Sequence, residues 1–218
     1  MAHTTMSYAW ISWKVNSGKC KKMKGGLLVS SMNEMSRADP FSGRLIWLRP
    51  FELEDLDQVI SQVNQYEARI SLGNFIPWSS EQEKDFIEKQ ATWADDDKNY
   101  HYAIIEKSTN DVIGGIGLFI ENTKNRTASL GIGIYHPRNF DKGYGSDAIK
   151  CMLSIGFDIL NLHRIELYMY AFNARARHVY EKLGFKYTGR KRDVLLFEGM
   201  YHDAITMDML EDEYREFK

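Results

Sequence analysis

The chain has 218 residues, of which 44% are apolar and 27% charged, and this composition suits one globular domain with a substantial core. Its net charge of -2 gives no argument for nucleic-acid binding, and no apolar run reaches the ~20 residues of a membrane helix. The two cysteines, Cys20 and Cys151, form neither a disulfide framework nor a zinc-binding spacing. We therefore expect a cytoplasmic protein with no metal and no nucleic-acid or membrane partner.

The N-terminal segment differs in composition from the rest of the chain. Residues 1–42 are basic, and no continuous apolar segment follows their positive charges, so they make a poor signal peptide. We expect residues 1–42 to be an irregular basic N-terminal extension and residues 43–218 to form the folded domain. The extension either packs loosely or acts as a basic arm that contacts a partner.

The first half of the domain predicts strands and helices separated by polar turns. Residues 43–51 alternate apolar and other side chains, whereas residues 53–64 repeat apolar side chains at helical spacing. In chain order we expect a strand at 43–51, a helix at 53–64, a loop at 71–80, a helix at 81–97 capped by Ser79 or Ser80, and strands at 101–107, 112–121 and 127–135. The three consecutive strands predict an antiparallel meander.

The second half of the domain begins with the loop HPRNFDKGYG at residues 136–145. It continues with a helix at 146–161, a strand at 163–172, a helix at 173–185, and a hairpin of strands at 187–197 and 201–210. This order of elements predicts the α+β class, with a single mixed, mostly antiparallel sheet flanked by helices.

The loop before the helix at 146–161 contains Gly143 and Gly145. Glycines let a ligand approach the backbone closely, and the first turn of a helix offers unpaired N–H groups and a partial positive charge. This combination predicts an anion site, often for a phosphate. The chain has no P-loop motif. A dinucleotide-binding motif lies inside a parallel unit, whereas this loop follows an antiparallel meander, so neither common phosphate motif fits.

The chain resembles the GNAT superfamily of acyl-CoA-dependent N-acetyltransferases over roughly residues 43–212. The resemblance rests on three segments, which read IGIYHPRNFDKGYGSDAI, FDILNLHRIELYMYAFNARARHVYEKLGF and GRKRDVLLFEGMYHDAITMDML. Within it, the chain is most similar to the branch of ribosomal-protein N-terminal and spermidine acetyltransferases. The resemblance implies that acetyl-CoA is the co-substrate and that a primary amine attacks it directly. The amine is a protein N-terminal α-amine, a polyamine or another small amine. The alternative is a non-catalytic acyl-CoA binding or regulatory module on the same fold.

The family's loop has the form Gln/Arg-x-x-Gly-x-Gly/Ala, and residues 140–145 read FDKGYG. Phe140 and Asp141 are unusual there, because a carboxylate beside a pyrophosphate repels it unless it points away. The resemblance assigns the loop and the end of the preceding strand to the cofactor. These residues are Ile134, Tyr135, Phe140, Asp141, Lys142, Gly143, Tyr144, Gly145 and Ser146.

Asn173 and Tyr180 are seven residues apart, about two helical turns, and so share a helix face. In the family this Asn contacts the pantetheine arm, and the Tyr protonates the departing thiolate. A phenol with a pKa near ~10 is protonated at neutral pH and can donate. Asn173 also fits a helix N-cap, and Tyr180 also fits a packing role.

The general base and the donor to the carbonyl oxygen each have two candidates in the sequence. Glu121, at a strand end, is the best carboxylate for the general base, and a water relay is the alternative. Gly131 and Gly133 fit either a bulge that frees an amide near Ile134 for the carbonyl oxygen, or close packing. We expect His178, two residues from Tyr180, to point elsewhere.

Phe75 and Trp78 either line the acceptor site or pack against the core or a lid. The sequence leaves open whether the protein forms a homo-oligomer.

Overall fold

The computed structural model describes residues 39–73, 75–92 and 98–218. Residues from Ala38 to the C-terminus form one unit. The predicted extension, residues 1–42, lies almost entirely outside the described residues and stays a prediction; Cys20 also lies outside them. None of the helices in the described part of the chain is long and apolar enough to cross a membrane.

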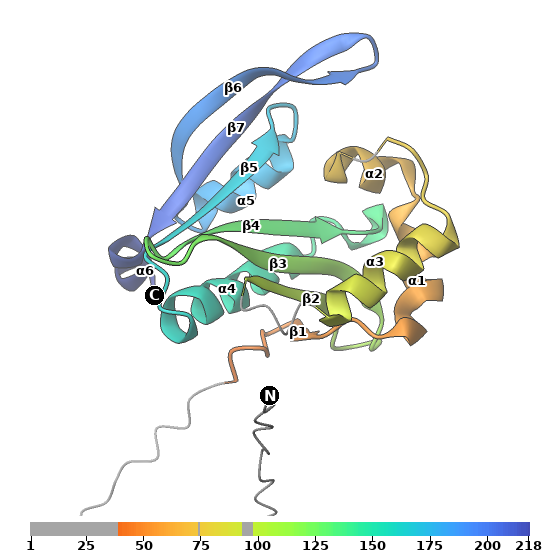
Figure 1. Cartoon of the computed structure of the whole chain (residues 1–218), viewed down its shortest axis with the longest axis horizontal. Coiled ribbons are helices and arrows are strands. Elements are labelled where there is room, and N and C mark those ends of the chain that lie inside the picture. The colour runs from red at the N-terminus through yellow and green to blue at the C-terminus, as the bar shows by residue number, and fades with distance from the viewer. Residues whose placement is uncertain (1–38, 74, 93–97) are drawn as a thin grey trace, which may run out of the picture. The chain divides into compact units, whose positions relative to one another are not determined.

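A seven-stranded sheet runs through the domain in the order β1-β2-β3-β4-β5-β7-β6 (Figure 1). Neighbouring strands are antiparallel except β4 and β5, which are parallel. The strands are β1 (Ile46–Arg49), β2 (Asn99–Glu106), β3 (Val112–Asn122), β4 (Thr127–Ile134), β5 (Arg164–Tyr170), β6 (Lys186–Phe197) and β7 (Met200–Leu210). The predicted mixed, mostly antiparallel sheet is confirmed.

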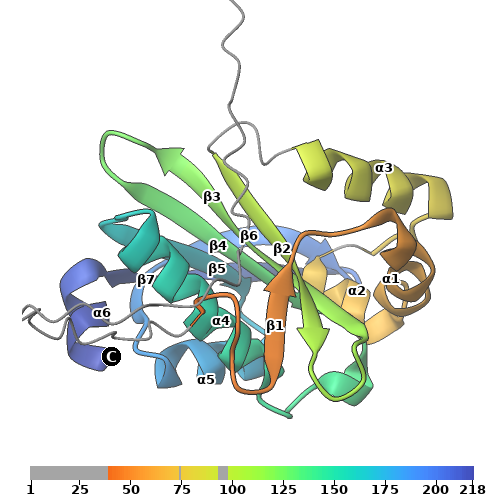
Figure 2. The same ribbon diagram turned by 90° about the horizontal axis from the view of Figure 1, so that it is seen from below.

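Helices cover both faces of the sheet (Figure 2). One face carries α4 (Tyr144–Ser154), its π-helical continuation (Ile155–Ile159) and α5 (Ala174–Lys182). The other carries a 3-10 turn (Leu53–Asp55), α1 (Leu56–Val63), α2 (Tyr66–Leu72) and α3 (Ser80–Thr92). Because both faces are covered, residues 112–118 of β3 are all buried, which explains their nearly continuous apolar and glycine sequence.

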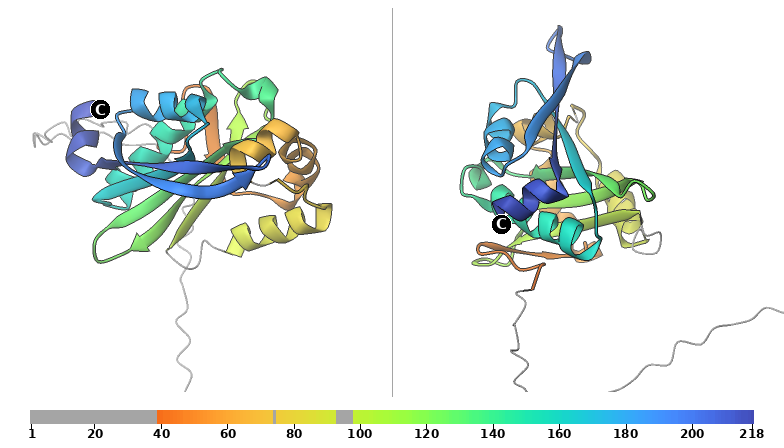
Figure 3. Two further views of the ribbon diagram at one scale, coloured as in Figure 1. Left: turned by 90° about the horizontal axis from the view of Figure 1, so that it is seen from above. Right: turned by 90° about the vertical axis from the view of Figure 1, so that its left-hand side faces the viewer.

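The core divides into two clusters, one on each face of the sheet. Ile149 and Met152 of α4 belong to the larger cluster, whereas Val59 of α1 and Ile87 of α3 belong to the smaller one. The β6–β7 hairpin projects beyond the other strands (Figure 3). The chain ends in α6 (Glu211–Phe217).

Two helices were not predicted from the sequence. The short α2 ends at Gly73, whose left-handed backbone (φ 71) stops the helix, and α6 follows directly on β7. The start of α3 is as predicted, since Ser79 Oγ accepts a hydrogen bond from Gln82 N at 3.2 Å and Gln82 Oε1 accepts one from Ser79 N at 2.9 Å. This reciprocal pair is a capping box.

Of the two roles considered for Gly131 and Gly133, the structure has close packing and no bulge in the pairing with β3. The β3–β4 register is unbroken from Gly114↔Ile134 to Ile120↔Ala128, and its one irregularity lies between Ile120 and Asn122. The glycines serve close packing instead. Gly115 pairs with Gly133 and Gly117 with Gly131, so the four form one patch on the face covered by α1–α3, here called the glycine floor.

Side chains lie directly on the glycine floor. A Cβ atom on Gly115 would be 2.5 Å from the Tyr135 hydroxyl oxygen, and one on Gly117 would be 2.7 Å from His101 Cδ2. Any larger residue would therefore displace the side chains that cover the floor.

Candidate active site

The sheet opens between β4 and β5. The two strands are in register only at residues 127–129 and 164–166, although β4 continues to Ile134 and β5 to Tyr170. Tyr135 N donates to Ile113 O of β3 at 2.9 Å. Because N–H groups alternate in direction along a strand, those of Ile132 and Ile134 point into the gap.

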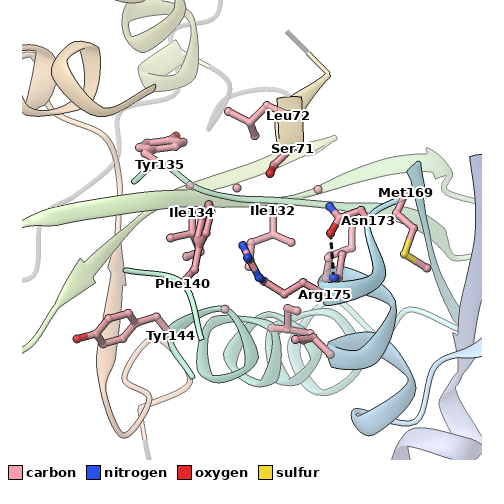
Figure 4. Close-up of a pocket in the computed structure, with 18 of the residues that line it drawn as sticks. Ser71, Leu72, Ile132, Ile134, Tyr135, Phe140, Tyr144, Met169, Asn173 and Arg175 are labelled. Atoms are coloured by element: carbon pink, nitrogen blue, oxygen red, sulfur yellow. Dashed lines mark hydrogen bonds between the residues drawn. The ribbon is translucent and has the colours of Figure 1, made fainter. Parts of the chain in front are cut away.

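A cavity of about 660 Å³ occupies this gap (Figure 4). Figure 4 shows Tyr135, Ser71 and Leu72 on one side of the β4 ribbon and Phe140, Tyr144 and Arg175 on the other. The cavity thus passes through the sheet. Its loop end is lined by residues of the glycine loop, α4 and α5, including Phe140, Gly143, Tyr144, Gly145, Ser146, Asn173, Arg175 and Tyr180. Its α3 end is lined by Trp78, Glu83, Phe86, Gln90 and His101.

The loop end has the backbone geometry of an anion site. Gly143 is the N-cap of α4 in a left-handed conformation (φ 87), which glycine adopts without strain. The first hydrogen bond of the helix is from Asp147 N to Gly143 O at 3.0 Å, so the amides of residues 144–146 precede it. The carboxylate of Asp147 accepts from Leu45 N at 2.6 Å and so faces β1, away from an anion at these amides.

Arg175 was missed by the sequence analysis. Its guanidinium lies 4.3 Å from the centroid of the Phe140 ring, and its Nε is 3.3 Å from Asp141 Oδ1. The two residues that depart from the family's loop pattern are thus the two that contact this cation. A positive charge comes to the loop from α5, and it offsets the charge of Asp141. No local signal in the sequence joins residues so far apart.

Tyr180 fits the role of a proton donor. It is buried, lines the cavity, and meets Phe185 edge to face with ring centroids 5.8 Å apart. Burial raises the pKa of the phenol to about 12, so it stays protonated at neutral pH. Cys151 is buried in α4 and does not line the cavity, and burial raises the pKa of its thiol to about 11. A thiolate relay through Cys151 is therefore disfavoured.

Asn173 is the N-cap of α5, because its Oδ1 accepts a hydrogen bond from Ala176 N at 3.1 Å, and it also lines the cavity, where its contact with the pantetheine arm stays a prediction. Other predicted cofactor residues also line the cavity, and their role in binding stays a prediction: Ile134, Phe140, Asp141, Gly143, Tyr144, Gly145 and Ser146. Lys142 does not. His178 is exposed but lines the cavity, contrary to the expectation that it points elsewhere.

Tyr135 also lines the cavity, but on the side of β4 away from Phe140, and its assignment to the cofactor stays a prediction. Its amide is bonded to β3, and its side chain lies on the glycine floor at the α3 end. Trp78 lines the same end. Phe75 instead stacks on Phe197 of β6, with ring centroids 4.8 Å apart, and has a packing role.

Glu121 is not at the cavity. It is exposed, does not line the cavity, and lies at the irregularity between Ile120 and Asn122 near the β3–β4 turn. The cavity lies at the other end of β4, beyond residue 129. An exposed carboxylate outside the cavity cannot take a proton from an amine held inside it, so Glu121 is not retained as the base.

A mixed sheet that opens between two parallel strands, with an anion-binding helix start and a buried phenol at the gap, is the arrangement of an acyl-CoA N-acetyltransferase. Comparison with known proteins gives the same class, since residues 45–186 match the family model described as acetyltransferase (GNAT) domain. The chain belongs to this family and is an N-acetyltransferase. Nothing in the comparisons supports the alternative of a non-catalytic module.

Relatives agree with the branch predicted from the sequence. A spermidine N(1)-acetyltransferase of Escherichia coli is 29% identical over 177 residues, which cover 79% of this chain and 90% of that protein. A spermidine N-acetyltransferase from Vibrio cholerae, solved in complex with CoA and spermine, superposes with a TM-score of 0.69 at 26% identity and covers 78% of this chain and 98% of its own. A Bacillus subtilis relative, 31% identical over 102 residues (46% of this chain and 55% of that protein), is provisionally named a ribosomal N-acetyltransferase.

Proposed function

We propose that this N-acetyltransferase uses acetyl-CoA as its acyl donor and a primary amine as its acceptor, which attacks the thioester directly. The observation that carries the proposal is the cavity through the sheet, which has an anion site at one end and buried Tyr180 beside the gap. A cofactor with a phosphate at the loop end can extend its acyl arm into the gap. The acceptor then approaches from the α3 end.

The residues at the loop end fit the cofactor. The amides of residues 141–146 would hold the pyrophosphate, and Arg175 would add a positive charge beside it. Asn173, at the start of α5, would contact the pantetheine arm. The reactive thioester is supplied by the cofactor, and the chain's part is to bind and orient it.

The gap would serve the chemical step. As the amine attacks, negative charge develops on the thioester oxygen, and the amide of Ile134, on the gap side of β4, is the donor we propose for it. The phenol of Tyr180 gives its proton to the departing thiolate. Because Cys151 is buried away from the cavity and burial raises the pKa of its thiol, we propose direct attack by the amine rather than a relay through this cysteine.

The acceptor class is a primary amine. The names of the relatives place polyamines first among the candidates, followed by protein α-amines and other small amines. The α3 end, with aromatic walls and the acid Glu83, suits a cationic group. We infer a cytoplasmic location from the cysteine usage alone.

A thiol-release assay tests the proposal. Acetyl-CoA is mixed with the full chain and, in separate reactions, with spermidine, butylamine and a peptide that has a free N-terminus. We expect thiol release that depends on one of these amines, with acetylated product seen by mass spectrometry. Calorimetric binding of CoA without thiol release in any reaction would instead favour the non-catalytic module.

A further inference from the structure

The α3 end of the cavity contains a buried acid that the sequence analysis did not single out. Glu83 is 2% exposed and lines the cavity. Within the described residues, its Oε2 has no hydrogen-bond partner and its carboxyl forms no ion pair. A buried carboxyl without a partner is costly and uncommon, and at a cavity wall it points to a ligand that supplies a cation or a proton.

The position of Glu83 follows from the packing of α3. Glu83, Ile87 and Gln90 share the buried face of this helix, and the first and third of them border the cavity. Acids elsewhere on α3, such as Glu81 and Glu88, are exposed and form long contacts with Lys84. The sequence signal that could have found Glu83 is therefore a polar residue on the apolar face of an amphipathic helix.

The groups around Glu83 are neutral or already paired. Asp55 accepts two 2.7 Å hydrogen bonds from the guanidinium of Arg49. Burial raises the pKa of Tyr135, and the charges of Glu83 and Asp55 raise it further. Burial lowers the pKa of His101 to about 4, so its ring is neutral, and its Nδ1 lies 2.5 Å from Gln90 Oε1. Burial likewise raises the pKa of Glu83 to about 7, close to the value that suits a base working at neutral pH.

We propose that Glu83 is the general base, whose carboxylate accepts a proton from the ammonium group of the acceptor at the α3 end of the cavity. This inference rests on the proposed function. The neutral amine then forms the C–N bond to the acetyl carbon, and the C–S bond breaks. The nitrogen loses two protons in all. One goes to Glu83 and then to solvent, and the other returns to the phenolate of Tyr180, which has given its own proton to the sulfur.

Other groups at this end are poor bases. The phenol of Tyr135 keeps its proton, because burial and the charge of Glu83 raise its pKa. His101, with a pKa of about 4, is a weak base. The rings of Trp78 and Phe86, 5.6 Å apart, and of Phe86 and His101, 5.9 Å apart, wall the cavity and favour a cationic group beside the carboxylate.

The kinetic test uses Glu83→Gln, which keeps the size of the side chain but cannot accept a proton. The control is Glu88→Gln, an exposed acid on the same helix. The readouts are kcat and KM for the fastest amine of the panel from about pH 6 to about pH 9, with CoA affinity by calorimetry. We expect Glu83→Gln to lower kcat about 10²–10⁴-fold and to remove the limb of the pH profile near 7, with CoA affinity unchanged and Glu88→Gln at wild-type values.

A wild-type kcat and pH profile in Glu83→Gln, or loss of the limb in Glu121→Gln instead, would overturn the inference. A second readout needs no activity. In isotope-labelled carboxyl NMR of the free protein, the resonance missing from Glu83→Gln should titrate near pH 7. Titration near the ordinary 4.5 refutes the base even in an active enzyme. Wild-type protein that titrates near 7 but releases no thiol with any amine refutes the proposed function itself.

Discussion

The buried carboxyl of Glu83 should make the stability of the protein depend on pH in a way that one substitution removes. Its pKa rises from an ordinary 4.5 to about 7 in the folded state. Between these values the folded protein holds a proton that the unfolded chain has released, so the free energy of unfolding falls as the pH rises. From pH 5 to pH 8 the loss is about 2.5 kcal/mol, which corresponds to roughly 5–10 °C in Tm for a chain of this size.

Glu83→Gln has no such proton to lose. The measurement is urea unfolding of both proteins at pH 5 and at pH 8. The change in the free energy of unfolding between the two pH values is compared for the wild type and the variant, because all other groups contribute equally to both. We expect the wild type to lose about 2.5 kcal/mol more than the variant over this range. Parallel losses in the two proteins would mean that Glu83 titrates like an exposed acid, and the description of the α3 end would then be wrong.

Further predictions concern the loop end, the gap and the extension. Tyr180→Phe should lower kcat about 10²–10⁴-fold, nearer the low end because thiolate is a tolerable leaving group. CoA affinity and stability should be nearly unchanged, and a wild-type kcat would assign the residue to packing. Gly145→Asp should weaken CoA binding at least severalfold, because it adds a negative charge to an anion site. The control is Gly199→Asp, at a turn where an added Cβ has no atom within 4 Å, and it should bind CoA as the wild type does. Arg175→Ala should weaken CoA binding about threefold to tenfold, most strongly at low salt, and a salt-independent loss would argue against a charge contact. Removal of residues 1–38 should leave a folded protein that binds CoA; insolubility or a Tm many degrees lower would make the extension part of the core or of an oligomer interface.

Much of the fold could be predicted because its signals are local. Short apolar runs bounded by turn residues mark β2, β3 and β4, and the capping box at Ser79 and Gln82 marks the start of α3. At Gly143 the expected helix entrance is present, with a left-handed N-cap before the helix. At Gly131 the sequence left two roles open, because a bulge and close packing require the same residue, and only the unbroken register separates them.

The sequence by itself determined the family, and it singled out the glycine loop and the pair Asn173 and Tyr180, whose roles stay predictions. Each of these signals depends on residues near one another in the chain. Only the tertiary structure decided which charged groups enter the site. It brings Arg175 onto Phe140 and Asp141, it leaves Glu121 exposed, and it buries Glu83 at the wall of the cavity. Burial and partnership depend on what covers a side chain, and the covering residues lie far away in the chain. For that reason the acids of this sequence look alike until the helices pack on the sheet.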